Sequence, residues 1–281
     1  MERSFHITGT TIACLLSVLM LASCKKENKI VENDDDRKMY KLPQGNQPYD
    51  QQIMEFYNKY KTVILYNFVE SDFSYSFTGP MEAGLWITPA GPNGIQQTLD
   101  FLQQHWFSMY PDEFLKKNLP FKLLLASDIR KRLEWGVHDT IQLKARPGYR
   151  NVAFGLTGHL DNLSHAAIDS ARGSLHGAFW LQAILSGTIE MPPGFPSLSA
   201  YPADPAAMKL AGTFSWRSPM DGMLDVGDHI EMITSHHKSW LDANLFTPAN
   251  DPAGNYKKKY NIIVNFYKTK YNIDLQAIGD L

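Results

Sequence analysis

The chain has 281 residues, a formal net charge of −2 and 44% apolar residues. This length and composition can bury a sizeable core, in one large domain or two small ones. The near-neutral charge lacks the basic excess of nucleic-acid-binding proteins, so we expect no nucleic-acid partner. No G-x-S-x-G, P-loop, G-x-G-x-x-G or C-x-x-C motif occurs. This argues against a serine hydrolase and against a glycine-rich phosphate-binding loop.

The N-terminus has the pattern of a bacterial lipoprotein signal peptide. Arg3 precedes a run of apolar or small residues, Ile12–Leu21, which is shorter than the roughly 20 residues that a membrane span needs. The run leads into Leu-Ala-Ser-Cys, which ends at Cys24 and matches a lipobox. We therefore expect residues 1–23 to be removed and Cys24 to carry lipid on its thiol and its new amine. A plain signal peptide with a chance cysteine is the alternative.

The two cysteines limit the chemistry of the mature domain, and the residue after the lipobox indicates the membrane to which the protein is sorted. Cys14 leaves with the signal peptide and Cys24 is consumed by lipid, so the mature domain has no thiol. This excludes disulfides, thiolate zinc sites and cysteine nucleophiles. Lys25 follows the lipidated cysteine, where an aspartate would favour retention in the inner membrane, so we expect an outer-membrane lipoprotein. The sequence does not distinguish the periplasmic face from the cell surface.

The next segment has the composition of a tether, and the folded domain follows it. Residues 24–46 start at the lipidated cysteine, are charged and end in Pro43 and Gly45. Such a segment cannot bury enough apolar surface to offset the entropy of ordering. Residues 47–281 are then predicted to form a single domain.

Apolar periodicity predicts the helices and strands of this domain. Strands are expected at 63–68, 73–77, 121–125 and 151–156, and helices at 53–60, 94–118 with a break near Pro111, 175–185, 226–241 and 256–271. The helix at 175–185 is apolar nearly all round, as a helix buried inside a domain would be. A proline-rich loop, 191–205, follows it. Strands mixed with helices, without regular βαβ alternation, predict an α+β fold with a mixed sheet packed on helices.

Histidine and carboxylate side chains are the candidates for metal binding. His176 lies in the buried helix, and His229 lies close to Glu231 in a later helix. Zinc needs three or four ligands around one point, and the usual helical motif has two histidines four residues apart. No two histidines of this chain have that spacing. Each is therefore interpreted as a surface or hydrogen-bonded residue, and a zinc site that draws on His176, His229 and Glu231 is kept as an alternative.

Several segments together resemble one protein family. They are 114–125 (FLKKNLPFKLLL), 151–155 (NVAFG), 189–195 (IEMPPGF), Ser218-Pro219, 228–232 (DHIEM) and 260–275. With the lipobox, they resemble Bacteroidetes lipoproteins called substrate import-associated zinc metallohydrolases, within the zinc-binding metallopeptidases. The resemblance covers nearly the whole mature chain. It implies a zincin-like fold and, as partners, a TonB-dependent importer and its substrate-binding lipoprotein.

The same resemblance places the zinc motif of that family, H-E-x-x-H, on the helix before the Pro-Pro loop. Counted back from that loop, its first histidine falls on Phe179, its glutamate on Trp180 and its second histidine on Ala183. None of these residues can bind zinc or take a proton from bound water. Glu231 falls where the family has a downstream carboxylate, a third ligand, and a lone carboxylate cannot hold zinc.

The sequence therefore predicts a lipid-anchored pseudo-peptidase with a binding or scaffold role, without catalytic residues and without a cofactor. One alternative is an active zinc metallopeptidase with a non-standard ligand set, His176, His229 and Glu231, and then Zn²⁺ is its cofactor. The second alternative is a glycan- or peptide-binding lipoprotein whose aromatic side chains stack on the ligand. The sequence does not name the imported substrate or the oligomeric state.

Overall fold

The structure is a computed structural model that describes residues 39–73, 84–132, 140–161, 163–195, 202, 204–214 and 222–281. One compact unit spans Lys41–Leu281. The end of the predicted tether, 41–46, lies within this unit, where Oε1 of Gln44 accepts a hydrogen bond from the backbone N–H of Tyr66 (2.8 Å). The predicted signal peptide and Cys24 lie outside the described residues. No described helix is long and apolar enough to cross a membrane.

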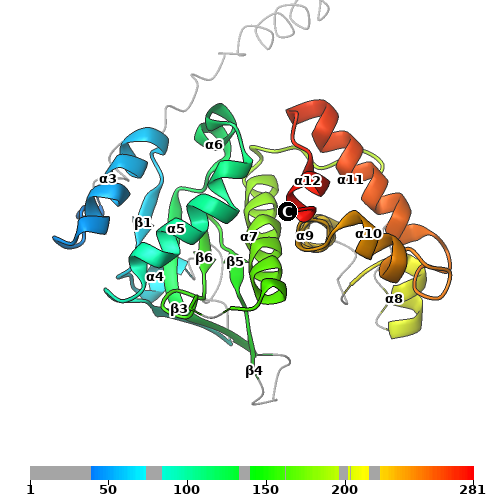
Figure 1. Ribbon diagram of the computed structural model, residues 1–281, viewed down its shortest axis with the longest axis horizontal. Helices are drawn as coiled ribbons and strands as arrows, with labels where there is room; N and C mark the ends of the chain where they lie inside the picture. Colours follow the sequence, from blue (N-terminus) through cyan, green and yellow to red (C-terminus); the bar gives the residue numbers. More distant parts are fainter. Residues whose placement is uncertain are drawn as a thin grey trace, which may run out of the picture. The chain divides into compact units, whose positions relative to one another are not determined.

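Six strands form one mixed sheet (Figure 1). They are β1 (Val63–Leu65), β2 (Leu85–Pro89), β3 (Lys122–Arg132), β4 (Thr140–Gln142), β5 (Ala145–Pro147) and β6 (Asn151–Phe154). The first half of β3 pairs in parallel with β1 and β6, and β5 pairs antiparallel with β6. The second half of β3 pairs antiparallel with β2 on one side and β4 on the other. This mixed sheet with its helices confirms the predicted α+β class.

The helices lie on both sides of a central helix, α7 (Figure 1). The described helices are α3 (Pro48–Tyr60), α4 (Glu70–Phe73), α5 (Ile95–His105), η1 (Phe107–Met109), α6 (Asp112–Asn118), α7 (His165–Leu185), α8 (Pro205–Ala211), α9 (Gly222–Ser235), α10 (Lys238–Trp240), the π-helical turn η3 (Leu241–Leu245), α11 (Asn255–Tyr271) and α12 (Leu275–Gly279). α7 stands between the sheet and the group formed by α9, α11 and α12 (Figure 1). It therefore links the two halves of the core.

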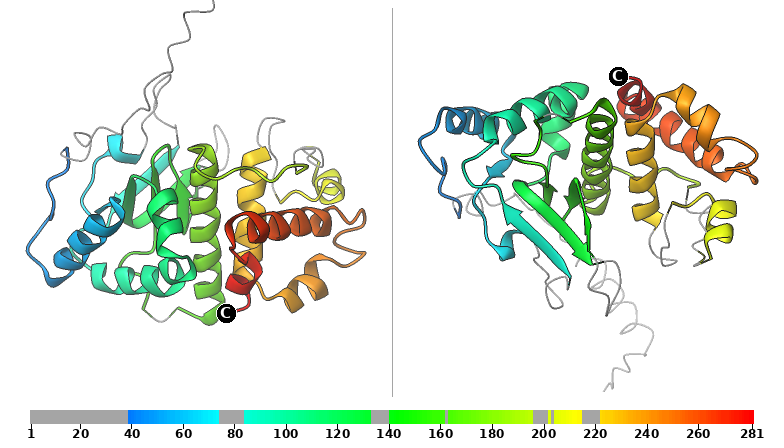
Figure 2. Two further views of the ribbon diagram at one scale, coloured as in Figure 1. Left: turned by 90° about the horizontal axis from the view of Figure 1, so that it is seen from above. Right: turned by 60° about the horizontal axis from the view of Figure 1, so that its bottom comes forward.

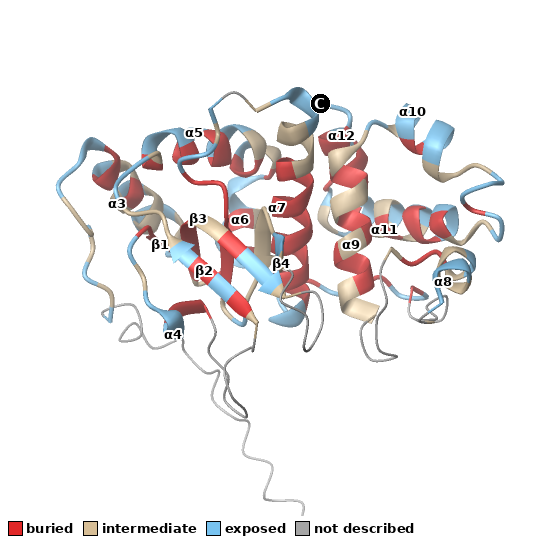
Figure 3. Ribbon diagram, turned by 90° about the horizontal axis from the view of Figure 1, so that it is seen from below, coloured by how far each residue is buried: buried red, intermediate tan, exposed pale blue. Residues whose placement is uncertain are grey.

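α7 is buried along most of its length (Figure 3). It begins at Ser164, whose Oγ accepts a hydrogen bond from the backbone N–H of Ala167 (3.2 Å), a normal N-cap. Every residue from Ala171 to Ile184 is buried. The sequence predicted this helix only from residue 175, because the ten residues before it are more polar and show no apolar stripe. The serine cap was the available signal for the earlier start.

The predicted strand 73–77 is wrong at its first residue, and 74–77 lie outside the described residues. Phe73 ends the short helix α4. A carboxylate oxygen of Asp72 accepts a hydrogen bond from the backbone N–H of Val69 (3.0 Å), which closes the turn at the start of this helix. Such a local side-chain bond to the backbone competes with strand formation.

The predicted helix 226–241 ends earlier, at Ser235. The carbonyl of Met232 in its last turn accepts hydrogen bonds from Oγ of Ser235 (3.3 Å) and from Nδ1 of His236 (3.2 Å). His237 is extended, and α10 begins after it. These side chains thus satisfy a carbonyl that would accept from a backbone N–H if the helix continued.

Candidate functional site

α7 and α9 pack closely, because glycines of α7 face α9 (Figure 2). Gly173 and Gly177 are four residues apart and share one face of α7. A Cβ atom added at Gly173 would lie 2.5 Å from Cβ of Ser235, and one added at Gly177 would lie 2.9 Å from Cβ of Glu231. Both distances are well inside normal carbon–carbon contact. A larger residue at either position would therefore have to push the helices apart.

Glu231 of α9 reaches α7 at this crossing. Its Oε1 accepts a hydrogen bond from Oγ of Ser174 (2.6 Å). Gly227, one turn before Glu231, faces Leu181, since a Cβ added at Gly227 would lie 3.2 Å from Cβ of Leu181. The α7 residues that face α9 here are Gly173, Ser174, Gly177 and Leu181.

A hollow of about 370 Å³ opens beside the crossing. Its lining includes the carboxylates of Asp228 and Glu231, the hydroxyls of Ser170 and Ser235, and the imidazole of His236. These groups both accept and donate hydrogen bonds. We call this hollow, together with the crossing, the α7–α9 site.

The three predicted motif positions, Phe179, Trp180 and Ala183, are fully buried in α7. Phe179 follows Gly177 by two residues, so it lies about 200° around the helix from the glycine face. Its ring packs edge-on against the ring of Tyr110, with centroids 5.4 Å apart. Nε1 of Trp180 donates a hydrogen bond to the hydroxyl of Tyr110 (2.8 Å). Phe179 and Trp180 therefore belong to an aromatic core, and Glu231 meets the side of α7 opposite Phe179.

His176 is part of the same aromatic core. Its Nε2 lies 3.0 Å from the carbonyl oxygen of His105 and donates to it, so its Nδ1 accepts from the hydroxyl of Tyr110 (2.5 Å). Burial lowers the pKa of His176 to about 3, so the ring is neutral at neutral pH. Both ring nitrogens are engaged in hydrogen bonds, which leaves no lone pair for a metal ion.

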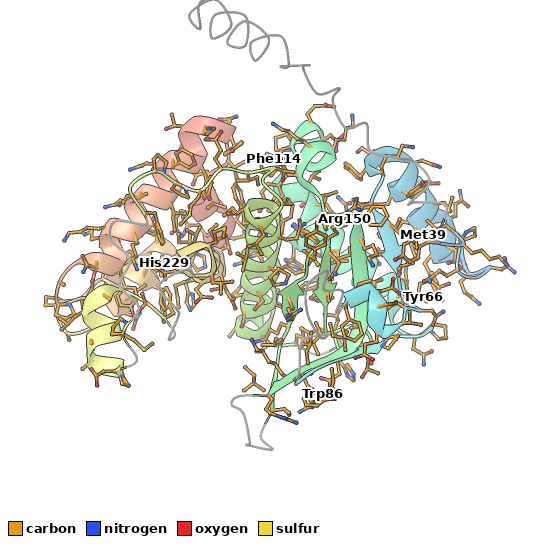
Figure 4. The ribbon with its side chains drawn as sticks, turned by 180° about the vertical axis from the view of Figure 1, so that it is seen from behind. Met39, Tyr66, Trp86, Phe114, Arg150 and His229 are labelled. Atoms are coloured by element: carbon orange, nitrogen blue, oxygen red, sulfur yellow. The ribbon has the colours of Figure 1, made fainter. Side chains whose placement is uncertain are left out.

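His229, labelled in Figure 4, is buried in a second cluster, together with Asp225 and Lys259. Its Nδ1 donates to the carbonyl oxygen of Asp225 (2.8 Å). Nζ of Lys259 donates to Oδ2 of Asp225 (2.7 Å) and to the carbonyl oxygen of Gly212 (3.0 Å). Burial raises the pKa of Asp225, but hydrogen bonding to His229 and the charge of Lys259 outweigh this and hold it below its usual value. The cluster ties α9 to α11 and to the end of α8.

The side chains of the three residues considered as zinc ligands do not form a zinc site. His176, His229 and Glu231 lie in three different surroundings; His176 and Glu231 are hydrogen-bonded, whereas His229 is engaged through Nδ1 and its buried Nε2 has no hydrogen-bond partner among the described residues. Within the described ranges, no group of three His, Cys, Asp or Glu side chains could hold a metal ion. The α7 face opposite Glu231 offers glycines and a serine hydroxyl, whereas zinc prefers imidazole, thiolate and carboxylate ligands.

The architecture is that of an α+β protein with a mixed sheet and a buried central helix. It is similar to the crystal structure of a protein from Bacteroides caccae ATCC 43185 that is described as a "putative zinc-binding metallo-peptidase". The TM-score is 0.55 at 12% sequence identity, over 88% of this chain and 91% of the other. No protein-family model and no curated protein matches the chain. The likeness establishes a metallopeptidase-like fold, and activity has to be argued from the residues.

Sequence reasoning missed the residues that form the crossing: Gly173, Ser174, Gly177 and Gly227. A signal was present, because Gly173 and Gly177 have the spacing G-x-x-x-G within a segment that is otherwise a good helix. Glycine costs about 1 kcal/mol in a helix, so two on one face indicate that another backbone approaches closely there.

Proposed function

We propose that this protein is a catalytically inactive relative of zinc metallopeptidases, with a binding or scaffold role at the outer membrane. The observation that carries the proposal is the α7–α9 crossing. Glu231 meets Gly177 and Ser174 there, and neither residue can complete a zinc site. Hydrolysis by this class of enzyme needs metal-bound water and a base beside it. The described residues of the α7 face supply neither.

The hollow of the α7–α9 site supports the binding role. Its carboxylates, hydroxyls and imidazole can hold a polar ligand by hydrogen bonds, without breaking a bond in it. The ligand would lie beside α9, close to Asp228 and Glu231.

The lipobox adds a location to the proposal. Lipid on Cys24 attaches the protein to the outer membrane, and the family resemblance suggests a TonB-dependent importer and its substrate-binding lipoprotein as partners. Cells grown with labelled palmitate are expected to label the wild-type protein and the Cys14→Ser variant, but not Cys24→Ser. Equal labelling of Cys24→Ser and wild type would show that Cys24 does not carry the lipid and would contradict the proposed membrane anchor.

Metal analysis combined with a peptidase assay tests the central point. Protein purified from membranes is expected to contain far less than one zinc ion per chain and to show no EDTA-sensitive cleavage of a peptide library. The variant Glu231→Gln should give the same values as wild type. Stoichiometric zinc with EDTA-sensitive cleavage, both lost in Glu231→Gln, would overturn the proposal. That result would favour the enzyme with the ligand set His176, His229 and Glu231.

A further inference from the structure

The part of the sheet formed by β2, β3 and β4 presents one face to solvent. Burial alternates along β2, where Trp86 and Thr88 are exposed and their neighbours at 85 and 87 are buried (Figure 3). Arg130 of β3 is the register partner of Trp86 in β2 and of Gln142 in β4. Side chains at such opposed positions stand next to each other on one face of a sheet. Trp86, Arg130 and Gln142 therefore form a row across three strands.

Trp86 is the large apolar group of this row (Figure 4). The residue is 47% exposed, although an indole gains much by burial. The guanidinium carbon of Arg132 lies 5.5 Å from the centre of its ring, within range of a cation–π contact. This contact restricts the orientation of the ring and leaves part of it open to a ligand. Tryptophan and arginine are the residues that most often dominate binding energy at interfaces.

Asp128 orients the polar groups beside the indole. Its Oδ2 accepts a hydrogen bond from Nε of Arg130 (2.7 Å), and its Oδ1 accepts one from Nε2 of Gln142 (3.0 Å). Both side chains are thereby held before a ligand arrives, which lowers the entropy cost of binding. The terminal guanidinium nitrogens of Arg130 and the amide oxygen of Gln142 keep no partner among the described residues, so they are open for hydrogen bonds.

The described residues of this face include Asp128, Arg130 and Arg132, whose formal charges sum to +1, on a chain whose net charge is −2. Arg130 is paired with Asp128, and Arg132 has no carboxylate partner in the described part of the chain. A matching ligand is therefore flat, rich in hydroxyls and acidic. A uronic acid unit has all three properties: a C–H face that stacks on an indole, hydroxyls that bond with an amide, and a carboxylate that pairs with a guanidinium.

We propose that the exposed face of β2, β3 and β4 binds an acidic polysaccharide. Trp86 stacks on one sugar ring, Arg130 and Gln142 bond with its hydroxyls, and Arg132 pairs with a carboxylate. A peptide suits this face less well, because it would need backbone partners or a groove, and side chains standing on a flat sheet offer neither. The face is separate from the α7–α9 site, so this proposal does not depend on the function proposed there.

Calorimetric titration of the full-length mature protein with polygalacturonate tests the proposal. We expect binding that weakens as salt concentration rises, since an ion pair is involved. Trp86→Ala should weaken it at least tenfold and Arg132→Gln at least threefold. Trp240→Ala is the matched control, because Trp240 is also exposed, at 42%, but lies on α10. It should bind as wild type does, and thermal unfolding of each variant verifies that it is folded.

Three other probes separate this ligand from different partners: dextran as a neutral polysaccharide, polyglutamate as an acidic peptide and phosphatidylglycerol vesicles as an anionic membrane. Polygalacturonate should bind at least tenfold more tightly than dextran. Trp86-dependent binding of polyglutamate or of vesicles, without binding of polygalacturonate, would assign the face to a peptide or a membrane and overturn the proposal. Equal binding of polygalacturonate by wild type and Trp86→Ala would overturn it as well.

Discussion

The two buried faces of α7 are filled in opposite ways. Toward α9, Gly173 and Gly177 remove their side chains and let the two helices approach. On the opposite side, the ring of Phe179 packs on Tyr110, and Trp180, three residues after Gly177, lies between the two sides and packs on the same ring. Neither face leaves open space: at the glycines the two helices pack closely, and elsewhere aromatic rings fill the core.

This contrast shows why substituting zinc-binding residues into α7 would not be enough to create a zinc site. A metal-binding helix has to hold imidazoles in open space beside a carboxylate. On the face where Glu231 provides the carboxylate, a Cβ atom at Gly177 would already lie 2.9 Å from Cβ of Glu231. Where α7 carries large side chains, Phe179 and Trp180 are fully buried against Tyr110 and Tyr267. A zinc site would need a different spacing between α7 and α9.

The largest expected effect is on the aromatic face. Trp180→Ala removes a ring whose centroid lies 4.3 Å from that of Tyr267, together with the hydrogen bond to Tyr110. We expect the free energy of unfolding, measured by urea denaturation, to fall by about 3–5 kcal/mol. Leu185→Ala, at an exposed position of the same helix, should cost less than about 1 kcal/mol. Similar losses for both variants would show that the aromatic face is not a packed core.

A graded effect is expected on the glycine face. Gly173→Ala should destabilise most, by about 1–3 kcal/mol, because its Cβ would meet Cβ of Ser235 at 2.5 Å. Gly177→Ala should cost less, and Gly227→Ala least, since its nearest contact would be 3.2 Å. Alanine otherwise gains about 1 kcal/mol over glycine in a helix, which offsets the cost of Gly227→Ala. Urea denaturation gives the order, and a gain in stability for Gly173→Ala would contradict the close crossing.

The last prediction concerns His176 and the pH dependence of the free energy of unfolding. Its pKa is about 3 in the folded protein and about 6.5 when unfolded. The unfolded chain therefore binds one more proton between these values, and stability falls by up to about 1.4 kcal/mol per pH unit as pH drops from 6.5 toward 3. His176→Gln should remove this part of the slope, and the exposed His165→Gln should not. Identical slopes in wild type and His176→Gln would show that His176 is protonated in the folded state.

Long, strongly patterned elements could be predicted from the sequence. The apolar spacing of residues 53–60 and 256–271 located α3 and α11, and the break near Pro111 separates α5 from α6. The strands at 63–68, 121–125 and 151–156 correspond to β1, β3 and β6. The strands β4 and β5 were missed because three residues are too few for a pattern. β2 was missed although Leu85, Trp86, Ile87 and Thr88 alternate in burial.

The candidate site could be predicted only in part. Glu231 was singled out, and it does lie at the α7–α9 crossing. Its partner on α7 was sought at Phe179 and Ala183, by counting back from the Pro-Pro loop, whereas the residues that meet it are Ser174 and Gly177. The pairing of Asp225 with Lys259 joins residues that are 34 positions apart. Local patterns in the sequence carry no information about such a pairing.

The sequence by itself determined that α7 is a buried helix and that it carries no H-E-x-x-H motif. It also determined which residues of α7 share a face, because the helical period is a local property of the chain. Only the tertiary structure decided which face turns toward Glu231. A helix that is buried all round gives no amphipathic stripe to orient it, so its rotation depends on the packing of α9, the sheet and the aromatic core around it.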